Sequence, residues 1–377
     1  MTGLSVCLGC MLAVLTGGPA PAWASPDGTV AHWGHGAVSP VALHLPGAIA
    51  EVGTSNNSEY ALLANGTLWA WGSGRRGELG NGSTHSSVKP VQVEFPAGVK
   101  IASIPTDAMP WDTAFAIDTT GHVWGWGANR GGELCLGNTG SYSTPVELPL
   151  AHVTAVAGAY QHASYDAGGT LYSCGQNVHG QLGDGSTKQS LVPARVHGLS
   201  GRSVTTLVSG FNNMGALLSG GQYYDWGWNG GGQLGDGTVG GSSDVPVQVK
   251  LPAAVTQAVQ GGDVPRNGDT LVELSDGSVY AWGHNGAGQL GTGNRTSEPS
   301  PVRIFPPAGV TYTTLATGGD TSYAVSTAGQ VFAWGGNYAG QLGDGSKTPS
   351  TKPVLVESHA TSLISATSTE VAVSVSN

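Results

Sequence analysis

Charged residues are scarce in this chain of 377 residues. Only 10% of its residues are Asp, Glu, Lys or Arg, and 14 basic against 24 acidic side chains give a formal net charge of −10. A surface that binds nucleic acid needs an excess of Lys and Arg to neutralise phosphates, and this sequence has the opposite excess. We therefore expect no nucleic acid among the partners of the protein.

Long apolar stretches are absent after residue 24. No segment of residues 25–377 approaches the roughly 20 apolar residues that span a bilayer. Residues 1–24 carry no charge, include the apolar stretch from Leu4 to Leu15, and end in Ala22-Trp23-Ala24. That ending is typical of a signal-peptide cleavage site. The sequence therefore predicts a signal peptide over residues 1–24, a secreted or extracytoplasmic chain over residues 25–377, and no stable membrane insertion after cleavage.

Glycine and tryptophan, in contrast, are abundant. The chain contains 62 Gly, 21 Pro and 11 Trp, which is too much glycine for a helical protein and too many aromatic residues for a disordered one. Turns must be frequent. The composition favours a β protein with many short strands.

These residues form an internal repeat. The template is close to G-x-(aliphatic or Tyr)-(aromatic)-x-W-G-x-N-x-x-G-Q-L-G-x-G and is followed by P-V-x-V. Its Trp position recurs every 38 to 56 residues, at Trp33, Trp71, Trp126, Cys174, Trp226, Trp282 and Trp334. In the third unit, Cys135 is interpreted as an insertion within Glu133-Leu134-Cys135-Leu136-Gly137.

A period near 50 residues matches four strands of 5–6 residues and their turns, as in one blade of a β-propeller. The segment 27–34 matches the repeat at 276–283, and the C-terminal segment 372–377 matches the strand that precedes that repeat, 271–276. One blade is therefore split between the two ends. The expected fold is a single all-β domain over residues 25–377: a seven-bladed β-propeller in which an N-terminal strand closes the C-terminal blade.

At these repeats the chain resembles the regulator-of-chromosome-condensation repeat family, whose units carry the W-G…G-Q-L-G-x-G signature. The resemblance covers residues 27–377 and implies a seven-bladed propeller, here as a bacterial-type secreted member. One fold hosts many functions, so the resemblance implies little about activity. Family members usually carry His in the loop before the third template strand, and only His162 clearly retains it, so nucleotide exchange on a GTPase is not carried over residue by residue.

Motifs of known chemistry are missing from the sequence. The glycine loops lack the order of a phosphate-binding loop, and Asp184, Asp236 and Asp344 recur at one turn position in separate repeats. The His residues are scattered, and no nucleophile elbow or His-Glu-x-x-His is present. We expect no catalytic residue, no metal site, no cofactor and no enzyme activity.

The two cysteines beyond the signal peptide lie in neighbouring repeats. Cys174 stands where the other repeats have Trp, and Cys135 lies in the preceding repeat. Two interpretations stay open. The pair forms a disulfide in an oxidising compartment, which requires Cα atoms within about 7 Å, or one thiol fills a smaller core space and the other lies in a loop.

Recognition is expected in the loops that vary among the repeats, because equivalent loops emerge on one face of a propeller. A Trp in a loop is a typical interface anchor, and Arg side chains on an acidic protein favour an acidic partner; packing and solvation are the alternative roles. The candidate partner-binding residues are Trp111, Trp228, Arg75, Arg76, Arg130, Asn212 and Arg266.

The sequence thus favours a monomeric, exported, non-catalytic propeller that binds a protein partner, or a glycan, which the sequence does not identify. A carbohydrate- or cell-wall-binding module or enzyme is the first alternative, marked by two carboxylates converging near Trp111 or Trp228. Guanine-nucleotide exchange on a small GTPase is the second alternative, and it comes from the family resemblance alone.

Overall fold

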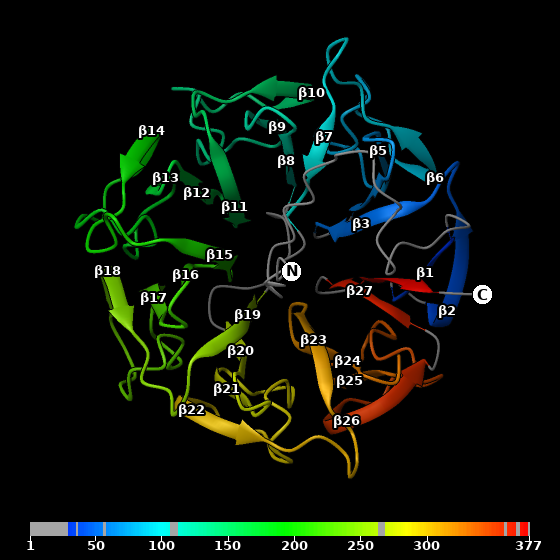
Figure 1. Cartoon of the computed structure of the whole chain (residues 1–377), viewed down its shortest axis with the longest axis vertical. Helices are drawn as coiled ribbons and strands as arrows, with labels where there is room; N and C mark the ends of the chain where they lie inside the picture. Colours follow the sequence, from blue (N-terminus) through cyan, green and yellow to red (C-terminus); the bar gives the residue numbers. More distant parts are fainter. Residues whose placement is uncertain are drawn as a thin grey trace, which may run out of the picture.

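The computed structural model of the chain describes residues 29–34, 37–55, 58–105, 112–262, 268–357, 360–366 and 370–375. The regular elements in these ranges are β-strands, which form four-stranded antiparallel sheets arranged around one axis (Figure 1). Within the same ranges we find no helix long and apolar enough to cross a membrane. The chain is therefore an all-β propeller, and that class was predicted from the sequence.

Six sheets, called blades 1 to 6, are each formed by one continuous stretch of chain. Blade 1 comprises β3 (Ile49–Thr54), β4 (Ser58–Leu63), β5 (Leu68–Gly72) and β6 (Ser87–Gln92). Blade 2 comprises β7 (Ile101–Ser103), β8 (Thr113–Asp118), β9 (Val123–Gly127) and β10 (Tyr142–Glu147). Blade 3 comprises β11 (Val153–Ala159), β12 (His162–Ala167), β13 (Thr170–Gly175) and β14 (Ser190–Arg195).

The second half of the ring repeats this plan. Blade 4 comprises β15 (Val204–Ser209), β16 (Asn213–Leu218), β17 (Tyr223–Trp228) and β18 (Ser242–Gln248). Blade 5 comprises β19 (Val255–Gly261), β20 (Asp269–Leu274), β21 (Val279–Gly283) and β22 (Glu298–Ile304). Blade 6 comprises β23 (Tyr312–Thr317), β24 (Thr321–Ser326), β25 (Val331–Gly335) and β26 (Ser350–Glu357).

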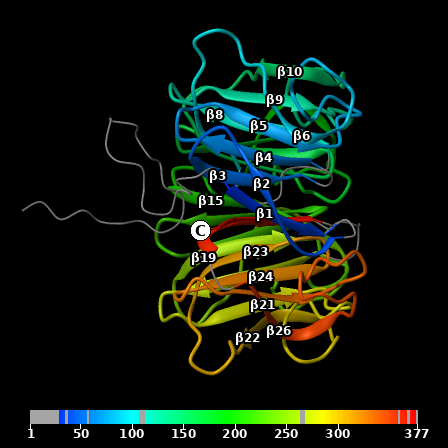
Figure 2. The ribbon, with the colours of Figure 1, turned by 90° about the vertical axis from the view of Figure 1, so that its right-hand side faces the viewer.

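The remaining sheet, the closing sheet, joins the two ends of the chain in the order β2-β1-β28-β27. Its strands are β1 (Thr29–Gly34), β2 (Ala37–His44), β27 (Ala360–Ala366) and β28 (Glu370–Val375). Residues 30–34 of β1 pair antiparallel with residues 370–374 of β28, and in side view β1 lies beside the C-terminal strands (Figure 2).

The predicted fold class needs correction at this sheet. Six blades, rather than seven, are each complete within one continuous stretch of the chain, and the closing sheet is composite. The predicted N-terminal strand is β1, which pairs with β28; β2, which was not predicted, also belongs to this sheet and pairs with β1 over residues 29–44. The match to the repeat at 276–283 revealed β1, whereas β2 corresponds to the outer strand of a blade.

The outer strand of each continuous blade is an exposed sheet edge. In contrast to the buried central strands such as β4 and β8, these strands are partly exposed, as in the pattern of β6. Proline cannot donate to a neighbouring strand, so it prevents pairing with another chain. Every outer strand carries a proline at the same position, and β22 carries Pro299 as well; the shared prolines are Pro90, Pro145, Pro193, Pro246, Pro301 and Pro353.

A tryptophan from the third strand of a blade packs on the preceding blade. Its indole N–H donates to a backbone carbonyl of the G-Q-L-G turn of that blade, and the ring is fully buried. The four bonds are Trp126 Nε1 to Glu78 O at 2.7 Å, Trp226 Nε1 to Gln181 O at 2.9 Å, Trp282 Nε1 to Gln233 O at 2.9 Å, and Trp334 Nε1 to Gln289 O at 2.8 Å. An unpaired buried donor would cost about 1–3 kcal/mol, so each bond fixes one blade against the next.

The second glycine of G-Q-L-G is required by the same contact. At Gly80, Gly183, Gly235 and Gly291 the backbone has φ of 62° to 69°. A Cβ at these four positions would lie 2.7 to 2.9 Å from the indole nitrogen of the next blade. Glycine is therefore needed both for the left-handed backbone and for the close approach of the indole.

The bulged position of the innermost strands makes a second contact between blades. In blade 5, Gln257 Oε1 accepts from Leu315 N at 3.0 Å and Gln257 Nε2 donates to Leu315 O at 3.3 Å. At the equivalent position of blade 1, Glu51 Oε2 accepts from Ile104 N at 2.8 Å, and burial raises the pKa of Glu51 to about 7. A protonated Glu51 can donate as Gln257 does, so the two side chains serve the same structural purpose.

We expect Gly235→Ala to lower the free energy of unfolding more than Gly277→Ala. Both glycines have positive φ, which costs alanine about 1–2 kcal/mol. A Cβ at Gly277 meets nothing within 4 Å, whereas at Gly235 it meets Trp282, which adds about 1–3 kcal/mol of overpacking. Urea denaturation of the two variants measures the difference, and equal losses would contradict the role given to the indole contact.

Candidate functional site

Two loops of each blade lie at the same end of the propeller. The inner loop joins the first and second strands, and the motif loop, which contains W-G-x-N-x-x-G-Q-L-G, joins the third and fourth. Backbone hydrogen bonds hold them together, as from Gln176 N to Gln161 O at 2.8 Å and from Trp228 N to Asn212 O at 3.0 Å. We call this end the loop face; it places the candidate residues on one composite surface.

The motif loop has a common internal framework. The Asn side chain of W-G-x-N accepts from the Leu N–H of G-Q-L-G, as Asn177 Oδ1 does from Leu182 N at 2.9 Å. The Gln or Glu side chain accepts the N–H two residues before it, as Gln181 Oε1 does from His179 N at 2.8 Å. These bonds, repeated in blades 2 to 6, use the polar side chains internally and leave the residue after Asn at the exposed tip of the loop.

The tip residues differ from blade to blade, while the framework is the same in blades 2 to 6; in blade 1, Gly74 takes the place of Asn and Glu78 Oε2 still accepts from Arg76 N. Blades 1 and 2 present arginine, blades 3 and 6 present large apolar side chains, and blades 4 and 5 present glycine. Val178 is 65% exposed and Tyr338 is 68% exposed. In order around the ring, the tips are Arg75, Arg130, Val178, Gly230, Gly286 and Tyr338. The loop face therefore carries a basic arc over blades 1 and 2 and separate apolar points elsewhere.

The basic arc contains the three arginines that the sequence singled out. Arg75 and Arg130 are exposed, and Arg76 is half-buried, with Nε 2.9 Å from Asp112 Oδ2. Asp112 lies in the inner loop of blade 2, so this ion pair ties the motif loop of blade 1 to the next blade. The structure places the arginines on adjacent blades.

A small pocket of about 100 Å³ opens beside the arc, between the motif loops of blades 1 and 2 and the inner loops of blades 2 and 3. Arg76 and Arg130 line it together with two carboxylates, an aromatic ring and an amide. The full lining is Arg76, Asp112, Thr113, Ala128, Arg130, Glu133, Tyr160 and Gln161. The pocket therefore mixes positive and negative groups at the junction of three blades.

The carboxylates near this pocket belong to the loop framework. Glu133 Oε2 accepts from Gly131 N at 2.8 Å and Oε1 accepts from Thr113 Oγ1 at 3.2 Å. Burial raises the pKa of Glu133, of Glu78 and of Asp112, and for Asp112 the nearby Arg76 and Arg130 oppose the rise. Glu78 and Glu133 occupy the position that is Gln in blades 3 to 6, which points to a structural role for both.

Trp228 and Asn212 lie on blade 4, away from this pocket. Trp228 is half-buried, its ring centroid is 4.5 Å from that of His179, and a Cβ at Gly230 would meet the ring. Asn212 is 5% exposed and its carbonyl accepts from Trp228 N. Both residues pack within the loop face. Trp111, Arg266 and the predicted signal peptide lie outside the described residues.

His162, the residue that retains the family's inner-loop histidine, is fully buried. Its Nδ1 lies 3.1 Å from Tyr160 O, and burial lowers its pKa to about 4. A neutral, buried imidazole supports the inner loop of blade 3 from beneath.

An aromatic pair on the loop face was not predicted from the sequence. Tyr160 and Phe211, from the inner loops of blades 3 and 4, stack with ring centroids 4.4 Å apart and an interplanar angle of 15°. Both follow closely on a Gly at the end of an innermost strand, and that shared position was the available signal. Tyr160 also lines the pocket, so the stack extends its wall toward blade 4.

No group of three or more His, Cys, Asp and Glu side chains within the described ranges is arranged to hold a metal ion.

The seven antiparallel sheets and the repeated Trp-Gly motif define the class of protein: a repeat-built β-propeller. The regulator of chromosome condensation (RCC1) repeat matches residues 65–105, 120–164, 168–217, 220–264, 276–325 and 328–374. The chain belongs to the RCC1 repeat family. This confirms the family that the sequence resembled.

Relatives in the family are much longer proteins or are distant in sequence. The ultraviolet-B receptor UVR8 of Arabidopsis thaliana is 30% identical over 297 residues, which cover 77% of this chain and 65% of UVR8. The human E3 ubiquitin-protein ligase HERC2 is 27% identical over 350 residues, 88% of this chain but 7% of HERC2. The chain thus spans less than two thirds of these relatives.

Solved structures show the same fold. Human WBSCR16 superposes with a TM-score of 0.81 at 19% identity, covering 93% of this chain and 99% of that one. Prp20p of Saccharomyces cerevisiae superposes with a TM-score of 0.79 at 20% identity, covering 94% and 93%. At these identities the likeness establishes the architecture alone.

We expect Glu78→Gln to stabilise the protein at neutral pH by about 1 kcal/mol. In blade 5 the equivalent Gln289 Nε2 donates to Asp320 Oδ1 at 3.2 Å, whereas in blade 1 burial and, to a lesser degree, the negative charge of Asp112 raise the pKa of Glu78. Because the pKa of Glu78 and that of Asp112 are raised in the folded protein, the wild type loses stability as pH rises through the carboxyl range.

Thermal unfolding between pH 4 and 8 measures this effect. The stabilities of the variant and the wild type should diverge as pH rises from about 4, the unfolded-state pKa of a carboxyl group. Glu94→Gln, at an exposed carboxylate, is the matched control and should leave the profile unchanged. Parallel pH profiles for Glu78→Gln and the wild type would contradict the raised pKa of Glu78.

Proposed function

We propose that this chain is an exported, non-catalytic propeller that binds an acidic segment of a protein partner through the basic arc of its loop face. The observation that carries the proposal is the contrast between the loop framework shared by blades 2 to 6 and the different side chains at the loop tips. Selection for packing alone would not require Arg75 and Arg130 at the exposed tips. Arginine is enriched at protein interfaces, where its planar guanidinium binds carboxylates.

The charge of the chain supports an acidic segment as the partner surface. The sequence has a formal net charge of −10, so a local basic arc over blades 1 and 2 stands out against its surroundings. Electrostatic complementarity of this kind steers encounter and fixes the orientation of the partner. Tyr160 and Gln161 at the pocket add an aromatic ring and an amide beside Arg76 and Arg130.

Export is part of the proposal. Its support comes from the charge-free, apolar segment 1–24 and from the disulfide between Cys135 and Cys174, since disulfides persist mainly in oxidising compartments.

The alternatives have less support. Around Trp228, the contacts are with His179 and Gly230 rather than with a pair of carboxylates, and Glu78 and Glu133 serve the loop framework. HERC2 is named as a ligase, but this chain matches only 7% of that protein. The similarity to Prp20p is a similarity of fold. We therefore propose binding without chemistry.

We expect the protein to select acidic sequences from a random-peptide display library, with affinity lost by about tenfold or more in an Arg75→Glu, Arg130→Glu double variant. Fluorescence anisotropy of a selected, labelled peptide measures the loss, and the loss should diminish at high salt. Lys250→Glu, an exposed change of the same sign in the loop after β18 at the opposite end, is the control. Absence of acidic enrichment, or equal losses in both variants, would refute the proposal.

A further inference from the structure

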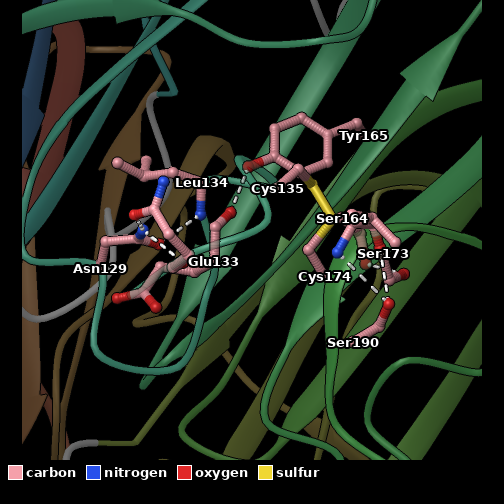
Figure 3. Close-up of a disulfide and its surroundings, with 11 residues drawn as sticks. Asn129, Glu133, Leu134, Cys135, Ser164, Tyr165, Ser173, Cys174 and Ser190 are labelled. Atoms are coloured by element: carbon pink, nitrogen blue, oxygen red, sulfur yellow. Dashed lines mark hydrogen bonds between the residues drawn. A yellow bond between two sulfur atoms is a disulfide. The ribbon is translucent and has the colours of Figure 1, made fainter. Parts of the chain in front are cut away.

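The junction of blades 2 and 3 differs from the junctions of blades 1–2, 3–4, 4–5 and 5–6, where an indole donates to the turn of the preceding blade. Cys174 of β13 stands at the Trp position, and Cys135 of the preceding motif loop is bonded to it, with Cα atoms 5.5 Å apart (Figure 3). Cys135 has φ of 58°, close to the 62° to 69° of the glycine that ends G-Q-L in other blades. Cys135 therefore replaces that glycine, and the interpretation of it as an insertion is wrong.

The two substitutions compensate each other. Elsewhere the glycine is needed because the indole of the next blade lies against it. At this junction the indole is absent, and the space holds two sulfur atoms whose residues are 0% and 1% exposed. The Gly–Trp contact has been exchanged for a covalent Cys–Cys contact at the same place.

The hydrogen bond of the missing indole has been exchanged as well. Glu133 O, the carbonyl equivalent to the indole acceptors, accepts from Tyr165 OH at 2.6 Å (Figure 3). Tyr60 and Tyr323 lie one position earlier in their strands, at the place of Ser164, and donate to the turn carbonyl of their own blades. Tyr165 therefore lies on the opposite face of its sheet and reaches back to blade 2. The disulfide and this hydroxyl together join the two blades.

The disulfide is also close in the chain to the walls of the loop-face pocket. Glu133 precedes Cys135 by two residues. Gly175 follows Cys174 and lies against Gln161: a Cβ on Gly175 would be 2.2 Å from the Gln161 carbonyl oxygen. Glu133 and Gln161 both line the pocket. The disulfide therefore joins the two chain segments that place Glu133 and Gln161 in the pocket lining.

We infer that the Cys135–Cys174 disulfide is an inter-blade lock whose reduction loosens the pocket and weakens partner binding; this regulation rests on the proposed function. A dithiol reductant supplies two electrons and two protons, becomes a disulfide itself, and leaves Cys135 and Cys174 as thiols. Two thiols do not fill the volume of an indole and carry no indole N–H. The reduced junction thus lacks the covalent bond between the cysteines. It also lacks the indole packing that holds the other blades together.

Hydrogen–deuterium exchange of the full chain tests the lock without any partner. Reduction with dithiothreitol should lower protection of the amides in residues 129–137 and 160–176 by about tenfold or more, with blades 5 and 6 unchanged. Equal protection in the oxidised and reduced wild type would overturn the lock.

Two matched variants separate the bond from the residues. Cys135→Gly with Cys174→Trp restores the pair used at the other junctions, and should keep protection within about threefold of oxidised wild type and lose its response to reductant. Cys135→Gly with Cys174→Ala removes both the bond and the indole, and should be as open as the reduced protein. If the alanine variant does not fold, the comparison of oxidised and reduced wild type decides alone; if it is as protected as oxidised wild type, the lock is refuted.

Binding of the selected acidic peptide tests the regulation. Its affinity should fall by about tenfold on reduction of the wild type and stay constant in the glycine–tryptophan variant. An unchanged affinity in a protein whose junction has opened would overturn the regulation and leave the lock in place. If no acidic peptide is selected at all, the proposed function fails while the exchange experiment still decides the lock, so the two failures are distinguishable.

Discussion

The contact of a buried indole with the preceding blade is the interaction on which the ring depends. A single blade cannot bury both of its faces, so each sheet needs a neighbour. The hydrogen bond from Trp Nε1 to the turn carbonyl fixes the position of one blade relative to the preceding one, and the glycine beside the carbonyl leaves room for the ring. One constraint thus accounts for the Trp, the glycine with positive φ, and the turn that displays the loop tips. At the junction of blades 2 and 3 the constraint remains, but a disulfide satisfies it.

The loop face follows from this arrangement. The Asn and Gln or Glu side chains of the motif loop are used internally in blades 2 to 6, and in blade 1 Gly74 replaces Asn while Glu78 keeps its bond to Arg76 N, so the residue at the tip is free to vary without cost to the fold. Arg75 and Arg130 occupy that position in adjacent blades, and Arg76 ties the arc to Asp112 of the next inner loop. The same loops that hold the ring together therefore also present the proposed recognition surface.

Much of the fold could be predicted from the sequence, because a repeat of Trp-Gly and G-Q-L-G reports a contact that recurs. The second strand of the closing sheet was missed, although Pro40-Val41-Ala42-Leu43 follows the P-V-x-V pattern of the outer strands, because no G-Q-L-G turn precedes it. Cys135 was misplaced although the sequence shows its equivalence to glycine: residues 132–137 align without a gap with residues 232–237, and the backbone conformation of Cys135 agrees. Among candidate site residues, the arginines were found from their template positions, whereas the Tyr160–Phe211 stack depends on two blades meeting in space.

The most direct test of the indole constraint is hydrogen exchange of the Trp indole N–H groups, followed by two-dimensional NMR of ¹⁵N-labelled protein. The account predicts that the indole resonances of Trp126, Trp226, Trp282 and Trp334 exchange slowly, with protection close to that of global unfolding. Indoles that exchange within minutes while the central strands stay protected would show that the blades are held together by something else.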